Sequence, residues 1–414
     1  MPEIVTRTLA CGLPLLVEPS TAVRSAAVSW LLPAGTAMDP ADQLGRSAMF
    51  AELLFRGAGS LDSKAQADAL DRLGLGRGCE VGGVFLRLAA TMIADRVHEA
   101  LHLLADMALR PRFDDAAIEP TRQLCMQAVA GLNDEPAERA ANILLQRHNP
   151  APLNRAGVGT EEGLANVTAD SLRAGWAQCV RPGGSILAVA GNVDPDAVAA
   201  TLDAALAGWS GAAAIPPVTP SPTAGTLHHQ HDLSNQVHIY LAHHAPAEPH
   251  PDSLLEKLVT GVLSAGSSSR LFTEVREKRG LCYSVSAGYG GDKSFGKVTA
   301  YVGTTPEKAQ QSLDVLLAEL RKLEQGRGII APDEFDRTMT GVRTRLVFAG
   351  ESTSARAAAL TADYHRLGRG RTLADIAREY AAVSLADLNA YVQRRRIGAP
   401  TVVTLGPSPL TLPA

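Results

Sequence analysis

The stretch SSSRLFTEVREKRGLCYSVSAGYGG, from Ser267 to Gly291, places helix, turn and strand signals directly next to one another. Its three serines can cap a short helix, and Gly280 can end that helix because glycine readily adopts the left-handed conformation found at helix ends. From Leu281 onward the side chains are expected to alternate between the two faces of a strand. One face is expected to carry Leu281, Tyr283, Val285, Ala287 and Tyr289, and the other Cys282, Ser284, Ser286 and Gly288.

Two hydrogen-bond donors flank the turn in this stretch. Arg276 comes just before the turn and Tyr283 just after it. A guanidinium and a phenol that are brought together can donate to a peptide carbonyl or to a developing oxyanion. Arg276 also belongs to the charged run 274–279, which is typical of a solvated helix face. The residues alone leave both interpretations open.

The order of residues in SSSRLFTEVREKRGLCYS resembles the second-half signature of the pitrilysin/insulinase family of zinc metallopeptidases, which includes the mitochondrial processing peptidase. The match covers a long run in fixed spacing. The resemblance implies that Arg276 and Tyr283 contact the backbone of a peptide substrate. It also implies two α+β domains that pack like a clam around a peptide chamber.

The composition is that of an ordinary soluble protein, with 414 residues, 46% hydrophobic and 20% charged, and a net charge of -4. Aromatic residues make up only 4% and no basic stripe is present, which argues against nucleic-acid binding. No run of about 18 apolar residues and no signal-peptide pattern occurs, so no membrane association is expected. Five scattered cysteines without paired spacing indicate reduced thiols in a cytoplasm.

The chain repeats one order of signals in two halves. Residues 211–226 are rich in proline and small residues and are predicted to form a linker. The linker separates an N-terminal domain, residues 1–210, from a C-terminal domain, residues 227–414. The segment VTADSL at Val167–Leu172 corresponds to VSLADL at Val383–Leu388, and each leads into a short helix and an apolar strand. The predicted fold class is therefore α+β, with two similar α/β sandwich domains.

A strand predicted at Val84–Ala90 follows the glycine-rich segment GLGRGCEVGG. Such an approach can leave the strand at an open sheet edge, where an extended peptide could add by backbone pairing. The alternative is an ordinary strand after a flexible turn.

The first half lacks the residues of the family's zinc site. In that family, His-x-x-Glu-His lies in the first helix after the opening strands, and a downstream Glu completes the ligand set. Alignment on FRGAG places Ala48, Ala51 and Glu52 at the His, Glu and His of this box, and Ala128 at the third ligand. One carboxylate without imidazoles does not make a tight zinc site. No metal and no other cofactor is therefore expected in this chain.

A different zinc motif, His-Glu-x-x-His, occurs at His98-Glu99-Ala100-Leu101-His102. The apolar residues around it keep the spacing of an amphipathic helix, so the two histidines are expected to flank a core face. Neither Glu119 nor Glu135, the nominal third ligands, belongs to a recognisable motif. A stand-alone zinc peptidase that uses His98, Glu99 and His102 is the alternative hypothesis.

Histidines are concentrated at the start of the second half, within residues 228–250. A metal site is conceivable there, but His238 alternates with apolar neighbours as on a strand with one solvated face, so solvated histidines are expected. His148 is expected at a helix end, where the helix dipole favours a cation. The seven clustered residues are His228, His229, His231, His238, His243, His244 and His250.

The resemblance and the changed zinc box together imply a catalytically inactive peptidase homologue. Such a chain would pair with a zinc-bearing subunit of the same family, forming a peptide-degrading or peptide-processing endopeptidase to which it supplies Arg276 and Tyr283. The zinc would then belong to the partner. A homodimer is also open, and so is a structural role like that of the core proteins of a respiratory complex.

Overall fold

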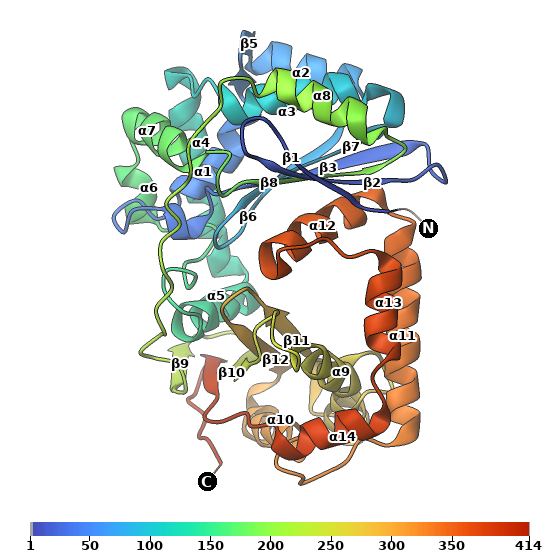
Figure 1. The fold of residues 1–414 in the computed structure, drawn as a ribbon. Coiled ribbons are helices and arrows are strands. Elements are labelled where there is room, and N and C mark those ends of the chain that lie inside the picture. Colours follow the sequence, from blue (N-terminus) through green and yellow to red (C-terminus); the bar gives the residue numbers. More distant parts are fainter. Residues whose placement is uncertain (1–2, 414) are drawn as a thin grey trace. The chain divides into compact units, whose positions relative to one another are not determined.

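The computed structural model describes residues 3–413, which form two compact units. Unit 1 contains the chain up to Gly131, together with Ala151–Thr219 and Phe348–Thr372. Unit 2 contains Leu132–Pro150, Pro220–Val347 and the chain from Leu373 onward. Each unit therefore includes one segment from the opposite half of the chain (Figure 1), an exchange that the sequence analysis did not predict.

Unit 1 is built on a six-stranded sheet with the order β1-β2-β8-β3-β7-β6. Its strands pair antiparallel except for β2 and β8, which are parallel. Its elements are β1 (Val5–Thr8), β2 (Pro14–Pro19), β3 (Ser25–Leu32), α1 (Arg46–Leu53), β4 (Gly57–Ala58), β5 (Leu61–Asp62), α2 (Ser63–Arg72), β6 (Gly76–Val81), β7 (Leu86–Ile93), α3 (Val97–Leu109), α4 (Asp115–Gly131), α6 (Glu161–Asn166), α7 (Ala169–Cys179), β8 (Ile186–Gly191), α8 (Pro195–Ala205) and α12 (Thr353–Leu367).

Unit 2 is built on a five-stranded sheet with the order β11-β12-β10-β13-β9, in which only β13 and β9 are parallel. Its elements are α5 (Pro136–His148), β9 (Leu227–His231), β10 (Val237–Ala245), α9 (Ser253–Ser264), the π-helix η4 (Phe272–Glu277), β11 (Cys282–Gly291), β12 (Gly296–Thr304), α10 (Ala309–Lys322), α11 (Pro332–Gly350, whose last turn enters unit 1), α13 (Leu373–Ala381), α14 (Leu385–Arg394) and β13 (Thr401–Gly406).

The two sheets share one plan, which confirms the predicted pair of similar α+β domains. The order β6-β7-β3-β8-β2 in unit 1 corresponds to β11-β12-β10-β13-β9 in unit 2. The matching segments VTADSL and VSLADL also form matching local structures. Thr168 and Ser171 make a capping box at the start of α7, and Ser384 and Asp387 make one at the start of α14.

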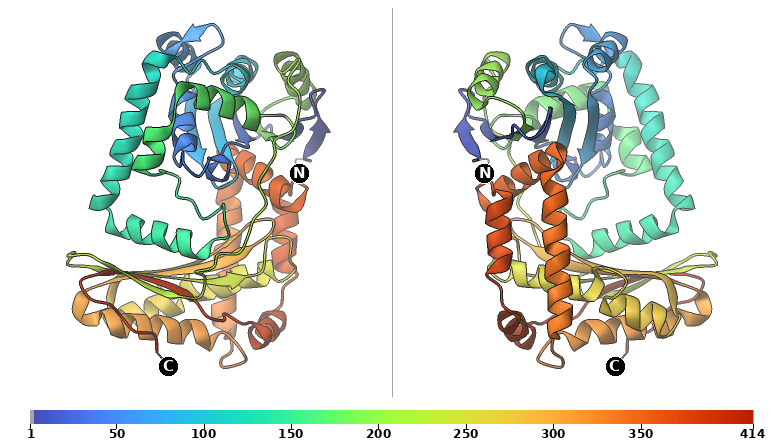
Figure 2. Two further views of the ribbon diagram at one scale, coloured as in Figure 1. Left: turned by 90° about the vertical axis from the view of Figure 1, so that its left-hand side faces the viewer. Right: turned by 90° about the vertical axis from the view of Figure 1, so that its right-hand side faces the viewer.

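The central strands explain why each sheet needs helices on both faces. All six residues of β8 and all six of β13 are buried, as expected for continuous apolar strands. In unit 1, α3 and α8 cover one face and the exchanged helix α12 covers the other (Figure 2). In unit 2, the exchanged helix α5 packs Ala140 and Leu144 against β10 and β13. The exchanged helices thus complete the second core layer of each unit.

The predicted open edge at Val84–Ala90 is wrong. This segment forms β7, an interior strand that pairs with β3 on one side and β6 on the other. The glycine-rich segment before it becomes β6 and forms the sheet edge instead. The glycine-rich segment was expected to be a flexible turn, but it is itself a strand that pairs with β7, and the other partner, β3, lies far earlier in the sequence. Within residues 3–413, no helix is both long enough and apolar enough to span a membrane.

The prediction of solvated histidines is wrong for two of the seven. His238 and His243 are only 5% and 1% exposed because β10 is an interior strand of the sheet. His238 Nδ1 lies 3.0 Å from the Tyr301 hydroxyl. His243 Nε2 lies 3.1 Å from Nη2 of the buried Arg395. Both histidines are therefore part of the packed sheet, and burial lowers the pKa of both, that of His243 to about 4.

The expectation that His148 is a cation is also wrong. The residue does end α5, but it is 3% exposed and its ring contacts that of His244, with centroids 4.7 Å apart and the ring planes tilted by 32°. Its Nδ1 meets the Thr401 hydroxyl at 2.8 Å, and its Nε2 has no hydrogen-bond partner among residues 3–413. Burial, reinforced by His244 and Lys297, lowers the pKa of His148 to about 3. Desolvation therefore outweighs the helix dipole.

Lowering the pH is expected to destabilise the packing of α5 in unit 2, because His148 is buried there in its neutral form. Between pH 6.5 and about 3, His148 is protonated in the unfolded chain but neutral in the folded chain. The free energy of unfolding therefore falls as the pH falls. This histidine should lower the free energy of unfolding by about 2 kcal/mol between pH 7 and pH 5. Urea unfolding of His148→Gln at both pH values should show a smaller difference than the natural chain. His250→Gln, which changes an exposed histidine of the same unit, is the control. Equal pH dependence in all three chains would contradict this role.

Candidate functional site

The structure brings Arg276 and Tyr283 together. The π-helix η4 carries Arg276, and the i to i-5 hydrogen bond from Lys278 N to Thr273 O, 2.9 Å long, marks its wide turn. The Arg276 guanidinium lies 4.8 Å from the centroid of the Phe272 ring and 5.3 Å from that of Tyr283. A cation held between two ring faces is stabilised by their quadrupoles. The two residues nominated from the sequence therefore form one donor pair.

The local turn forms largely as predicted. Gly280 has a φ of +58°, the left-handed conformation expected at the end of the helix. The predicted serine cap is wrong, because no side-chain cap bond is present at the start of η4 and Ser269 contributes its backbone carbonyl instead. The backbone N–H of Gly280 donates to Arg276 O at 2.9 Å, which links the turn directly to the residue that carries the guanidinium.

The predicted face for Tyr283 is also wrong. The pairing of β11 with β12 shifts register between Cys282 and Ser284, as in a β-bulge. Val285 and Ala287 pack against the core, whereas the Tyr283 side chain points away and is 83% exposed. A bulge interrupts the period of two and can re-aim one side chain. The result is a solvent-facing phenol beside Arg276, on the face opposite to Val285 and Ala287.

Some charged residues of the run 274–279 form ion pairs with one another, and Arg276 does not take part in these pairs. Glu274 accepts hydrogen bonds from Arg279 at 2.7 Å and from Lys278 at 2.6 Å, and these bonds lower the pKa of its carboxyl to about 2. Arg276 makes no ion pair with any carboxylate in the described part of the chain. The solvated-face interpretation thus fits Lys278 and Arg279, whereas Arg276 keeps its donors available to a ligand.

Three residues that the sequence analysis did not nominate hold this turn in place. Lys308 Nζ donates to the carbonyl of Gly280 at 2.7 Å. Thr304 and Ser312, both buried, donate their hydroxyls to the carbonyl of Leu281 at 2.5 and 3.4 Å. These residues follow the turn by more than 20 positions, so no local pattern identifies them. A cavity of about 300 Å³, lined in part by Tyr283, Thr304 and Lys308, opens beside the pair.

The positions aligned with the zinc box lie on two helices of unit 1. Helix α1 carries Ala48, Ala51 and Glu52, and helix α4, which packs against it, carries Ala128. Ala51 is buried in the core, whereas Glu52 and Ala128 are exposed. None of the four supplies an imidazole, so this group does not fit a zinc ion with the family's ligand set.

Two thiols near Glu52 do not replace the missing ligands. Cys79 lies on the neighbouring strand β6 and Cys125 on α4. Burial, with a smaller contribution from the charge of Glu52, raises the pKa of both thiols, that of Cys125 to about 11. Both are therefore protonated at neutral pH, whereas a metal needs the thiolate. Among residues 3–413, no three His, Cys, Asp or Glu side chains are grouped so that they could hold a metal ion.

The start of α1 shows that the helix itself is well formed without a metal. Asp39 accepts the backbone N–H of Gly45 at 3.1 Å and that of Ser47 at 2.9 Å, and it accepts the Ser47 hydroxyl at 2.8 Å. These bonds satisfy donors that a helix start leaves free. The altered box is thus part of an intact, capped helix.

The residues of the second zinc motif have other partners. The ring of His98 meets the Thr201 hydroxyl of α8 at 2.7 Å, and Glu99 pairs with Arg96 at 3.0 Å. His102 is exposed on α3. No third ligand-type side chain joins them within residues 3–413. The expected core face of this helix is confirmed, since Val97, Leu101, Leu104 and Ala108 are buried.

Two family models together match most of this chain. Residues 15–159 match "Insulinase (Peptidase family M16)" and residues 166–342 match "Peptidase M16 inactive domain". The chain is 24% identical to the Bacillus subtilis "Uncharacterized zinc protease YmxG", covering 92% of this chain and 93% of that protein. It is 25% identical to the Mycobacterium bovis "Uncharacterized zinc protease Mb2805c", covering 97% and 92%. The chain belongs to the M16 family.

Solved structures share the fold over almost the whole chain. The M16 inactive domain from Pseudomonas fluorescens superposes with a TM-score of 0.86 at 20% identity and covers 99% of both chains. A protease from Helicobacter pylori gives a TM-score of 0.84 at 19% identity, over 98% of this chain and 100% of that one. A chain of complex III2 from Candida albicans gives 0.81 at 18% identity, over 98% and 96%.

Proposed function

We propose that this chain is a non-catalytic subunit of a two-chain zinc metalloendopeptidase and that it contributes Arg276 and Tyr283 to peptide binding. One observation carries the proposal. The Arg276 guanidinium is held against Tyr283 with no competing carboxylate among residues 3–413, while the positions aligned with the zinc box offer no imidazole. The donors for a peptide carbonyl are kept, and the residues that would activate water are changed.

The proposal favours a heterodimer. Two copies of this chain would both lack the imidazoles of the zinc box, so the zinc must come from a relative that retains them. Both the Bacillus subtilis and Mycobacterium bovis relatives are named zinc proteases, which suggests the kind of chain that would act as partner. We also propose the cytoplasm as the compartment, since all five cysteines are free thiols.

A structural role is the second candidate, and the similarity to the complex III2 chain from Candida albicans favours it. That likeness concerns the fold alone. Tyr283 is 83% exposed and lies against an arginine that has no carboxylate partner among residues 3–413, so the pair contributes little to the core and the peptide-binding role explains the site better.

The purified chain is expected to contain no stoichiometric zinc and to cleave no unstructured peptide. Elemental analysis after dialysis against zinc measures the first, and a fluorogenic peptide measures the second. A variant with Ala48→His, Ala51→Glu, Glu52→His and Ala128→Glu should bind about one zinc ion, because α1 and α4 already pack against each other. Stoichiometric zinc in the natural chain would contradict the proposal. If that zinc were lost in His98→Ala with His102→Ala, the stand-alone peptidase would replace it.

Pairing is tested by co-expressing the chain with M16 relatives from the same genome that keep the His-x-x-Glu-His box. Sedimentation should show a stable two-chain complex, and peptide cleavage should exceed that of either chain alone. A complex that forms without any gain in cleavage would instead support the structural role.

A further inference from the structure

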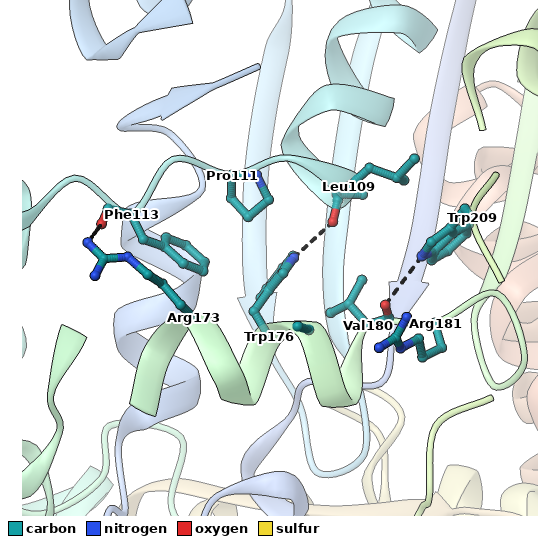
Figure 3. A pocket seen from close by; sticks show the side chains of 10 residues that line it. Leu109, Pro111, Phe113, Arg173, Trp176, Val180, Arg181 and Trp209 are labelled. Atoms are coloured by element: carbon teal, nitrogen blue, oxygen red, sulfur yellow. Dashed lines mark hydrogen bonds between the residues drawn. The ribbon is translucent and has the colours of Figure 1, made fainter. Parts of the chain in front are cut away.

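Unit 1 contains a cavity of about 250 Å³ that the peptide-binding proposal does not involve (Figure 3). It opens between the end of α3, the segment that follows α3, and helix α7 with the residues after it. Small-molecule sites begin at roughly 300 Å³, so this cavity suits a ligand of about one ring with a short chain. Its apolar wall consists of Leu109, Pro111, Phe113, Trp176, Val180 and Trp209.

The aromatic wall is fixed in place by hydrogen bonds. Trp176 donates its indole N–H to the carbonyl of Ala108 at 2.8 Å, and Trp209 donates its own to the carbonyl of Val180 at 3.3 Å. Trp176 also meets Phe113 edge-on, with ring centroids 5.6 Å apart. Both indole N–H groups are already used inside the protein. The cavity therefore presents ring carbons rather than donors, and the body of its ligand must be apolar.

Two arginines line the cavity, and only one of them, Arg173, forms an ion pair within the described chain. Arg173 donates to the carbonyl of Phe113 at 2.9 Å and pairs with Asp115, so it holds the wall (Figure 3). Arg181 has a single hydrogen bond, a 3.5 Å contact to the carbonyl of Ser210, and it pairs with no carboxylate in the described chain. No acidic residue lines the cavity. One positive charge is therefore available beside an apolar aromatic wall.

We infer that this cavity binds a small carboxylate that carries one aromatic ring. The ring packs against Trp176, Trp209 and Phe113, where edge-to-face contacts between aromatic rings are favourable. The carboxylate accepts hydrogen bonds from Arg181, whose planar fork matches two carboxylate oxygens. A neutral aromatic compound fills the same space but leaves Arg181 unused. A carboxylate without a ring leaves the wall bare.

Intrinsic fluorescence gives a direct test, because two of the three tryptophans line the cavity and the third, Trp30, contacts Trp209 at 5.9 Å between ring centroids. Titration of the full chain with 3-phenylpropionate should give a saturable change. The neutral analogue 3-phenylpropanol should bind about tenfold more weakly, and propionate should give no change. A tetrapeptide ending in phenylalanine carries the same ring and carboxylate, and its relative affinity distinguishes a free acid from a peptide C-terminus. No saturable change with either carboxylate would overturn the inference.

Substitutions of residues that line the cavity test whether the ligand binds there. Arg181→Gln should weaken 3-phenylpropionate about tenfold and leave 3-phenylpropanol unchanged. Arg72→Gln removes an exposed arginine elsewhere in unit 1 and should change nothing. Ala177 is an exposed residue of the cavity rim, so Ala177→Leu and Ala177→Phe should fill the cavity without disturbing the fold and abolish both ligands. Undiminished binding in a folded Ala177 variant, or equal losses in Arg181→Gln and Arg72→Gln, would place the ligand elsewhere and refute the site.

Discussion

Tyr283→Phe is expected to lower peptide turnover by the reconstituted two-chain enzyme by about 10²- to 10³-fold while the complex still assembles. Arg276→Ala should have an effect of similar size. The figure corresponds to the loss of one preorganised donor to an oxyanion, about 2.7 to 4 kcal/mol. It applies if the donors act on charge that develops in the transition state. A smaller loss, confined to KM, would indicate that they hold only the bound substrate.

The geometry supports an effect on the transition state. The phenol of Tyr283 has no hydrogen-bond partner among residues 3–413, so its O–H is free to donate. The guanidinium of Arg276 is oriented by two rings and lacks an ion pair in that same range. Both donors are therefore positioned before a substrate arrives. Preorganised donors need no rearrangement as charge develops, which is the source of their catalytic value.

Two control variants show whether a loss of turnover comes from the missing donor or from a disturbed structure. Arg279→Ala removes the same charge three residues away, but Arg279 is bound to Glu274, so turnover should stay near that of the natural pair. Tyr289→Phe removes a hydroxyl from the same strand, where it donates to the carbonyl of Pro246 at 2.7 Å. Sedimentation of each complex checks assembly. Full turnover with Arg276→Ala and Tyr283→Phe combined would make both residues structural and refute the role.

The sequence was a good guide where structure is local. The turn around Gly280 and the approach of Arg276 to Tyr283 depend on neighbours a few positions apart, although the serine cap expected in the same stretch does not form. Resemblance to a family nominated Ala48, Ala51, Glu52 and Ala128 as the zinc-box positions, and that prediction needs only aligned positions. The bulge between Cys282 and Ser284 depends instead on pairing with β12, so alternation alone placed Tyr283 on the wrong face.

Non-local packing accounts for the other differences. Nothing in the composition of α5 or α12 indicates which sheet either helix will cover, because both are simply amphipathic. The error at His148 has the same origin. A helix end favours a cation, but the strands that bury this ring come from the other half of the chain. The supports of the site turn, Thr304, Lys308 and Ser312, were missed for the same reason.

A buried ion pair joins the exchanged helix α12 to β2, and Glu18→Gln is expected to destabilise unit 1 by about 3 to 5 kcal/mol. Arg356 of α12 donates from Nη2 to Glu18 of β2 at 2.7 Å and from Nε at 3.0 Å. The side chains of Arg356 and Glu18 are only 5% and 8% exposed. Removing the carboxylate leaves a guanidinium in the core with no opposite charge. The glutamine oxygen can still accept one hydrogen bond, and the carbonyl of Arg371 accepts another at 2.8 Å, but neither neutralises the guanidinium.

Urea unfolding measures the loss, and hydrogen exchange along Thr353–Leu367 shows whether α12 itself is released. Asp196→Asn, which breaks the exposed pair with Arg7, should cost at most about 1 kcal/mol and serves as the control. The double variant Glu18→Leu with Arg356→Met should recover most of the stability, because a buried pair replaced by apolar side chains is often neutral. A loss below about 1 kcal/mol in Glu18→Gln, or a double variant as unstable as the single, would contradict the argument. The apolar contacts of Leu360 with the sheet would then be what holds the exchanged helix in unit 1.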